Sequence, residues 1–417
     1  MKHMQQSLLR SVLGLSLCWV GLGFAQAQVP ASASATAAVA FRPEVVQSLQ
    51  AAQDALKAGQ IDNALALAQK TLDLPGITPT EKPVIQRTLA VAAMQAKNFP
   101  LAIATLENLI QEMPESTADA QKLPIVESLL NASQQAQDHQ RVVDWARTYF
   151  KWGGQNPSVR PVLIQTLSLM KKHSDVVQEV QAKMRLDEVA HQKTTESELR
   201  LMAVSQHQLK DNAGYNNTLK ILLQNYPSKA YWSEIIPRMA RQASFNVRYD
   251  LDLYRLLELT GNMEDAVEYV DMANLALRNG LPAEAARVVE KAYSLGVFGK
   301  GSDAVNQQKL KVQVQQKVNE DEKTLPALEK SAKDANTIAS LAEVYASKQK
   351  WEQAIATYNK ALSMGGLKRD AEARLHAGMA LYKTGQKVEA ETMWDSIQGE
   401  ATAQDLAQLW KIWARAN

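Results

Sequence analysis

The residues of this chain that could do chemistry are few and widely spaced. Cysteine occurs only at position 18, so no second thiol is present to complete a disulfide or a thiolate metal site. Beyond it, no two histidines stand at metal-ligand spacing, and there is no His-Glu-x-x-His motif. These histidines are His139, His173, His191, His207 and His376. The sequence therefore predicts no metal site, no cofactor and no catalytic residue.

A glycine cluster at 296–302 ("GVFGKGS") could suggest a phosphate-binding loop. Such loops follow a strand and open a helix. This cluster lies between two expected helices, which favours a helix-ending turn. The paired carboxylates at 264–265 and 320–322 lie near expected helix starts or on charged faces, where they complement the helix dipole or face water.

One enzyme hypothesis comes from Glu196-Ser197. Lytic transglycosylases, which cut peptidoglycan and also use helical superhelices, place a serine after the catalytic glutamate. Their downstream Gly-Leu-Met-Gln signature is absent here, and "TTESELRLM" fits the first helix of a repeat. Packing is the favoured interpretation of Glu196.

The elements that carry these residues are predicted to be helices throughout. From Phe41 onward apolar residues recur at helical spacing, and no stretch alternates like a strand. Glycine and proline fall mostly between the helical segments. The pattern predicts an all-α chain of short antiparallel helices.

The spacing within "AEVYASKQKWEQAIATYNKAL" at 342–362 repeats along the chain. Small Ala342 and Ala354 would let two helices approach closely, while Tyr345 and Tyr358 fill the space beside them. This order resembles the tetratricopeptide repeat, a 34-residue helix-turn-helix unit. The resemblance implies a right-handed superhelical solenoid, because one helix pair cannot bury its apolar face alone.

Similar offsets recur elsewhere and set the expected domains. Fair copies begin near Leu89, Leu199, Tyr269 and Gly378. We expect a degenerate repeat array at 42–230, a clearer array at 231–400 and a capping helix at 401–417. Residues 302–337 depart from the repeat, as an insertion or a hinge. The terminal helix places Trp410 and Trp413 on one face, which suits a cap better than an exposed partner-docking helix.

The first 27 residues have the pattern of a cleaved signal peptide. Lys2 and Arg10 precede and flank a short apolar run, and Ala25-Gln26-Ala27 fits a cleavage site after Ala27. Residues 28–41 would form a flexible leader. We expect a periplasmic protein with no transmembrane segment in the mature chain. A lipid anchor at Cys18 is disfavoured because Leu17 precedes it.

The charge balance bears on possible partners. Without Lys2 and Arg10 the chain would carry 44 basic and 44 acidic residues. A neutral chain without a basic block offers little to a phosphate backbone, so no nucleic-acid partner is expected.

The expected binding surface is the groove lined by the first helix of each pair. Arginine, methionine and tyrosine on this surface suit a protein or peptide partner. The candidate groove residues are Arg87, Met94, Arg200, His207, Asn274, Arg278, Glu343, Met379, Tyr382 and Lys383. The carboxylate clamp of chaperone-binding members is not expected, because its positions hold Ala339, Glu343, Leu375 and Met379.

Residues 230–415 are similar to an exported proteobacterial family of tetratricopeptide-repeat proteins of undefined molecular function. The likeness is carried by "YWSEIIPRMARQASFNVRYDLDLYRLLELTGNM", "YVDMANLALRNGLPAEAARVVEKAYSLGVFGKG" and "GGLKRDAEARLHAGMALYKTGQKVEAETMW". Some similar proteins accompany TonB-type outer-membrane transport systems, which implies an envelope role. The sequence thus predicts a non-catalytic periplasmic scaffold that binds a protein or peptide. A holdase-like chaperone and, less favoured, a peptidoglycan-acting enzyme are the alternatives. The partner and the oligomeric state stay open.

Overall fold

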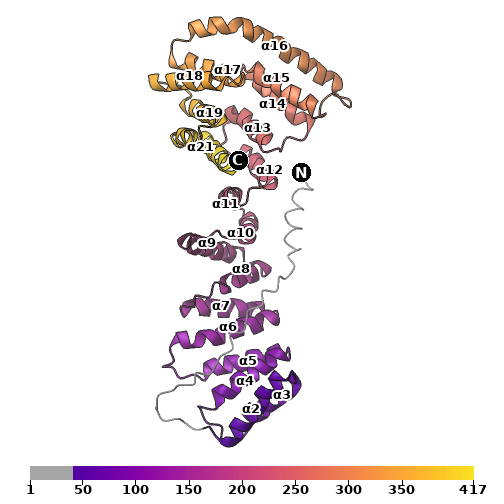
Figure 1. Cartoon of the computed structure of the whole chain (residues 1–417), viewed down its shortest axis with the longest axis vertical. Helices are drawn as coiled ribbons and strands as arrows, with labels where there is room; N and C mark the ends of the chain where they lie inside the picture. The colour runs from indigo at the N-terminus through magenta and orange to yellow at the C-terminus, as the bar shows by residue number, and fades with distance from the viewer. Residues whose placement is uncertain (1–40) are drawn as a thin grey trace. The chain divides into compact units, whose positions relative to one another are not determined.

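The computed structural model describes residues 41–417. The expected signal peptide, its cleavage site, Cys18 and nearly all of the leader lie outside the described residues. Within 41–417 the regular structure consists of twenty α-helices and one 3-10 helix, with no strand (Figure 1). The prediction of an all-α fold of tetratricopeptide-like helix-turn-helix repeats is confirmed.

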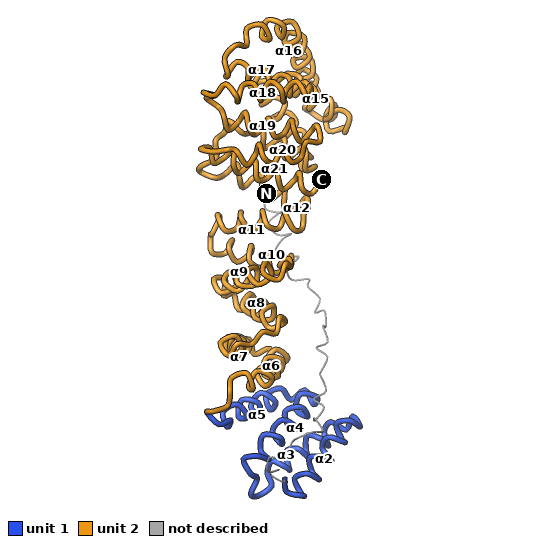
Figure 2. The backbone as a smooth tube through the Cα atoms, turned by 60° about the vertical axis from the view of Figure 1, so that its left-hand side comes forward, with its two compact units in different colours: residues 1–115 blue, residues 116–417 orange. Residues whose placement is uncertain are grey.

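The described residues divide into two compact units, residues 41–115 and 116–417 (Figure 2). The described helices of the first unit are α2 (Pro43–Lys57), α3 (Ile61–Leu72), α4 (Lys82–Gln95) and α5 (Phe99–Gln111). The second unit begins with α6 (Asp119–Gln135), α7 (His139–Lys151), α8 (Val159–Leu169), α9 (His173–Val189), α10 (Glu196–Gln208), α11 (Asn212–Asn225) and α12 (Lys229–Ala240). It continues with η1 (Val247–Tyr249), α13 (Asp250–Leu259), α14 (Ala266–Arg278), α15 (Pro282–Ser294), α16 (Ala304–Ser331), α17 (Ala335–Ser347), α18 (Trp351–Met364), α19 (Asp370–Lys383), α20 (Lys387–Asp395) and α21 (Ala401–Ala416).

The hairpins share one turn geometry. In α17–α18 the backbone N–H of Lys350 donates to the carbonyl of Tyr345 at 2.9 Å, and Asn98 donates in the same way to Ala93 at 2.8 Å in α4–α5. This six-to-one bond is typical of a Schellman helix end, which requires a left-handed residue before the donor. Gln349 fills that place with a φ of 56°, although glycine adopts this region at lower cost.

The small and aromatic residues of the repeat pack as their spacing indicates. Ala342, Ala354 and Tyr358 are completely buried, and Tyr345 packs half-buried against the same cluster. Apolar burial of this kind is the main stabilising contribution to such a fold.

The segment that departs from the repeat contains one long helix, α16, of 28 residues. Only Gln307, Leu310 and Val314 of this helix are buried. It connects α15 to α17, and these two helices also contact each other directly. The interruption therefore leaves α15 packed against α17.

The C-terminal helix α21 joins distant parts of the second unit. It packs on α19 and α20 and also contacts α11 and α13. Leu406 and Trp410 are fully buried, and Trp413 lies edge-on to Trp410 at 5.9 Å between ring centroids. A hydrogen bond from Lys220 Nζ to Asp405 Oδ1, 2.7 Å long, adds a polar link to α11.

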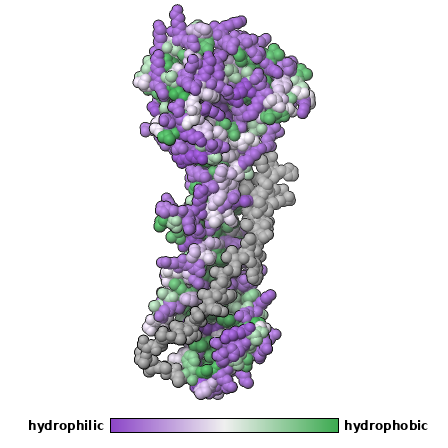
Figure 3. All heavy atoms as spheres, in the orientation of Figure 1, coloured by the Kyte–Doolittle hydropathy of each residue, from purple (hydrophilic) through white to green (hydrophobic). Residues whose placement is uncertain are grey.

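No helix within 41–417 combines the length and apolar character needed to cross a membrane. The face of helices α13–α21 seen in Figure 3 is mainly hydrophilic, with apolar residues scattered over it.

Candidate functional site

A buried charged network joins helices that are far apart in the sequence. Arg255 on α13 donates from Nε and Nη2 to the two carboxylate oxygens of Glu284 on α15, at 2.9 and 2.7 Å. Its Nη1 also donates to Asp252 Oδ1 at 2.8 Å. This two-point contact fixes the planar guanidinium between α13 and α15.

His376 on α19 extends the network across the second unit. Its Nε2 lies 2.9 Å from Asp252 Oδ1, and its Nδ1 lies 2.6 Å from Glu343 Oε1 on α17. Burial opposes protonation of the imidazole, but the carboxylates of Glu343 and Asp252 outweigh it and hold the pKa of His376 well above its usual value. Each ring nitrogen faces a carboxylate oxygen, so the protonated ring can donate from both; Nε2 also lies 3.2 Å from Nη1 of Arg255.

The two deepest carboxylates are correspondingly held ionised. Burial raises the pKa of Asp252, but the charges of His376 and Arg255 outweigh this effect and lower it overall. The pKa of Glu284 is lowered in the same way, because Arg255 outweighs the burial of the carboxylate. Both carboxylates also lie in the first turn of their helices, where the helix dipole favours negative charge.

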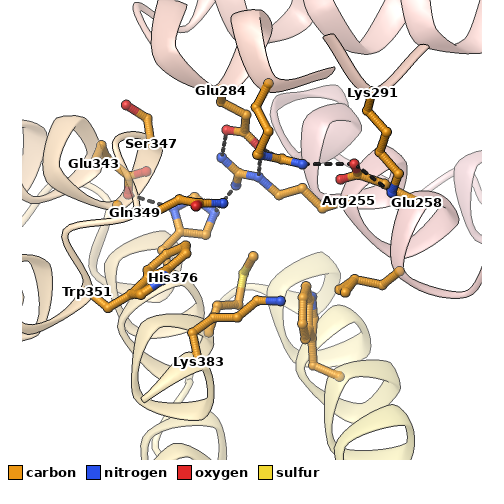
Figure 4. A pocket seen from close by; sticks show the side chains of 15 residues that line it. Arg255, Glu258, Glu284, Lys291, Glu343, Ser347, Gln349, Trp351, His376 and Lys383 are labelled. Atoms are coloured by element: carbon orange, nitrogen blue, oxygen red, sulfur yellow. Dashed lines mark hydrogen bonds and ion pairs between the residues drawn. The ribbon is translucent and has the colours of Figure 1, made fainter. Parts of the chain in front are cut away.

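Next to this network lies a pocket of about 330 Å³ (Figure 4). Its lining comes from α13, α15, α17, α18, α19 and α21 and from the turn before α18. The lining residues are Arg255, Glu258, Leu259, Glu284, Arg287, Lys291, Glu343, Ala346, Ser347, Gln349, Trp351, His376, Met379, Lys383 and Trp410. The buried ion pairs therefore form part of the pocket wall.

One side of the pocket carries a group of cations. Glu258 Oε1 accepts hydrogen bonds from Arg287 Nη1 at 2.8 Å and from Lys291 Nζ at 3.1 Å. Lys383 projects its ammonium toward the pocket interior (Figure 4), and within 41–417 no carboxylate pairs with it. Burial of that ammonium, and then the charges of Arg287 and Lys291, lower the pKa of Lys383, and the charge of Glu258 offsets only part of this effect.

Three of the sequence-predicted groove residues meet in this pocket: Glu343, Met379 and Lys383. Tyr382 packs instead against Trp413, with ring centroids 5.2 Å apart. The remaining candidates lie outside the pocket. Asn274 and Arg278 are on α14, which contributes no lining residue; Arg200 and His207 are on α10; Arg87 and Met94 are on α4. Whether these outer positions bind a partner stays a prediction.

Sequence reasoning missed the buried network. Asp252 and Glu284 look like ordinary carboxylates at helix starts, and Arg255 looks like a solvated i+3 partner. His376 was noticed only for its lack of a metal-ligand partner. The available signal was its place in "ARLHAGMA", where its neighbours have the small and apolar character of a buried helix.

The other residues that the sequence suggested for catalysis or ligand binding make packing and hydrogen-bond contacts instead. Glu196 begins α10 and accepts a hydrogen bond from the hydroxyl of Tyr231 at 2.5 Å. The turn with Gly296 and Gly299 packs Phe298 against Tyr293 and Tyr269. Within the described residues, no group of three or more histidine, cysteine, aspartate or glutamate side chains is arranged to hold a metal ion.

The fold and the pocket define an all-α helical-repeat protein with a charged pocket in its C-terminal repeats. Residues 49–117 and 340–397 match the sequence model of the tetratricopeptide repeat. The chain therefore contains tetratricopeptide repeats in the first unit and again at α17–α20, which supply part of the pocket. Such repeats generally form non-catalytic scaffolds that mediate protein–protein interactions. Among curated proteins, no sequence matches the chain.

Solved structures with partial similarity include other helical-repeat proteins. A tetratricopeptide repeat protein from Parabacteroides merdae is 10% identical, with 81% of this chain and 98% of that chain covered and a TM-score of 0.32. Yeast Tom70 is 11% identical over 89% of this chain and 96% of its own, with a TM-score of 0.25. A chain of the structure of Naa15/Naa10 bound to HypK-THB is 14% identical, with 89% of this chain and 68% of that chain covered and a TM-score of 0.27. These overall similarities are too low to carry a functional argument.

Proposed function

We propose that this protein is a non-catalytic periplasmic scaffold that binds a protein or peptide partner in the pocket of its C-terminal repeats. The main observation in support is the pocket, because its wall combines aromatic and thioether side chains with charged groups that are already fixed in place. Trp351 and Met379 provide apolar contact area, while Arg255 and His376 are held by buried ion pairs. A preorganised site loses little conformational entropy when a partner binds.

The chemistry of the pocket favours binding over catalysis. Asp252 and Glu284 have lowered pKa values and are engaged by cations, whereas a general acid needs a raised pKa. Arg255 is committed to both of these carboxylates. These three side chains therefore serve as structural ion pairs in and beneath the pocket wall.

The cellular location rests on sequence patterns. The segment before residue 28 resembles a signal peptide, and residues 230–415 are similar to an exported proteobacterial family. Together they support a periplasmic scaffold in an envelope or outer-membrane transport complex. Fractionation of cells that produce a C-terminally tagged chain, with N-terminal sequencing of the product, tests both the compartment and cleavage after Ala27.

The partner can be sought by crosslinking the tagged chain in its native cells and identifying the captured proteins by mass spectrometry. We expect one or two dominant envelope proteins, and we expect their yield to fall when Met379 is changed to Glu. A broad set of unfolded proteins, unaffected by this substitution, would favour the holdase-like chaperone. Clearing of peptidoglycan in a zymogram, lost on Glu196→Gln, would overturn the non-catalytic assignment.

A further inference from the structure

We propose that Lys383, Arg287 and Lys291 form a subsite that binds one acidic side chain of a peptide partner. The subsite lies on the cationic side of the pocket between α15 and α19. This inference rests on the proposed function, because it specifies which chemical group of the partner the pocket recognises.

The charges around the pocket do not balance. With His376 protonated, the cations exceed the carboxylates by one charge. The cations are Arg255, Arg287, Lys291, His376 and Lys383. The carboxylates are Glu258, Glu284 and Glu343 in the lining and Asp252 directly beneath it. A single negative charge would neutralise this set, and a carboxylate supplies one charge.

In the described part of the chain, the pocket cation without an ion-pair partner is Lys383. Arg255 and His376 are already paired with Asp252, and Arg287 and Lys291 share Glu258. Within 41–417 Lys383 forms no ion pair with a carboxylate. Burial of its ammonium and the charges of Arg287 and Lys291 make its protonated form less favourable, and the charge of Glu258 offsets only part of this effect. An anion bound beside Lys383 would relieve this repulsion and accept a charge-assisted hydrogen bond.

The size and lining of the pocket suit a short peptide segment. A volume of about 330 Å³ accommodates a side chain with part of its neighbours. Trp351, Met379 and Leu259 line the same pocket and offer contacts to apolar neighbours in a peptide. We therefore infer that the preferred segment has an acidic residue flanked by apolar ones.

This subsite differs from the carboxylate clamp considered for the repeat. Clamp positions in α17 and α19 hold Ala339, Glu343, Leu375 and Met379. The proposed contacts come from α15 and from the last residue of α19, which meet because α15 packs against α17 and α17 against α19. The subsite is a product of this tertiary arrangement.

Isothermal titration calorimetry at low ionic strength tests the proposal with two peptides. Both are acetylated, amidated pentapeptides with leucines around a central residue, which is glutamate in one and glutamine in the other. We expect the glutamate peptide to bind at least about tenfold more tightly, which corresponds to one charge-assisted hydrogen bond. Lys383→Met should remove this preference and Lys383→Arg should retain it. Lys360→Met, an exposed lysine of α18 outside the pocket, is the matched control.

Equal binding of the two peptides, unchanged by Lys383→Met, would overturn the acidic subsite and leave the scaffold function standing. Failure of the glutamate peptide to bind would overturn the subsite as well, whereas the scaffold function is judged separately by crosslinking in cells. Competition arms identify the anion. Acetate should displace the glutamate peptide. If inorganic phosphate displaces the peptide more strongly than acetate does at the same concentration of negative charge, the subsite recognises a phosphate group and the proposed carboxylate is wrong.

Discussion

Two regions of the second unit are held together by different forces. Between α17, α18 and α19 the contact consists of small and aromatic residues, with Ala342, Ala354 and Tyr358 fully buried. Between α13, α15 and α19 it consists of the ion-paired side chains of Arg255 and His376 with their carboxylate partners. The first region repeats along the chain, and the second occurs where the chain contacts itself over more than 120 residues of sequence.

The difference shows what each region contributes. Apolar packing tolerates substitutions that conserve side-chain volume, and it stabilises the stacked repeats. Buried ion pairs contribute little net stability compared with apolar residues of the same shape, but they are costly to break. The charged network therefore fixes a particular arrangement of helices around the pocket, and the repeat packing provides the supporting structure.

The largest effect should come from breaking the network at its centre. Arg255→Met leaves Glu284 and Asp252 buried without their shared cation, and we expect it to lower the free energy of unfolding by about 3–5 kcal/mol. Urea unfolding followed by circular dichroism measures this change. The control Lys317→Met removes the exposed pair with Glu320 and should cost less than about 1 kcal/mol. Similar losses for both variants would show that the network is not the stronger constraint.

The apolar region should be most sensitive at Gly378. A Cβ atom there would lie 2.3 Å from Nε1 of the buried Trp394 ring, which donates to the carbonyl of Leu375. We expect Gly378→Ala to destabilise the fold by about 1–3 kcal/mol through overpacking. A double-mutant cycle with Trp394→Leu provides the control, because a smaller side chain at 394 removes the clash. Additive effects in that cycle would contradict the packing explanation.

The network should also give stability a specific dependence on pH. The pKa of His376 is raised in the folded state, so its contribution is complete below the unfolded value of about 6.5 and is lost as pH rises through the folded value. The lowered pKa values of Asp252 and Glu284 act in the opposite direction and remove stability as pH falls below about 4.

Unfolding curves of the wild type and His376→Gln between pH 4 and 9 test this sign. The advantage of the wild type should be greatest between about pH 4.5 and 6.5 and should shrink above that range, by at most about 1.4 kcal/mol per pH unit. An advantage that grows with rising pH would contradict a protonated His376.

The smallest expected effect is a gain in stability from a substitution in the turn between α17 and α18. Gln349 has a φ of 56°, so Gln349→Gly relieves the left-handed strain and should stabilise the chain by about 0.5–1 kcal/mol. Gln353→Gly, inside α18, should instead destabilise it by about 1 kcal/mol. A loss of stability in both variants would mean that the turn gains nothing from glycine. Thermal unfolding of the three proteins decides this.

Burial could be predicted from the sequence where the packing follows the spacing of the repeat. The burial of Ala342, Ala354 and Tyr358 was predictable because neighbouring helices of a repeat meet at fixed offsets. The non-glycine turn residues, such as Gln349 and Lys97, were less visible because only their tertiary setting shows that they adopt left-handed conformations. The predicted domains and the outer groove residues are still predictions.

The charged network could not be derived in the same way. Its key contact joins Asp252 to His376 across 124 positions, and no period relates the two residues. Each looks ordinary in its own helix, since an acidic residue suits a first turn and a lone histidine has many roles. Glu343, Met379 and Lys383 were predicted as groove positions on first helices, and their role in binding stays a prediction. Their convergence with Arg287 and Lys291 in one pocket depends on the contact between α15 and α17.

We propose the pocket of the C-terminal repeats as the place where the partner binds. The most direct test is site-specific photo-crosslinking in native cells, with the photoreactive residue at Met379 in the pocket or at exposed Val388 on α20. We expect a discrete crosslinked protein from position 379, weakened by Lys383→Met, and none of that species from position 388. Equal capture of the same protein from both positions, or capture from 388 alone, would contradict the account.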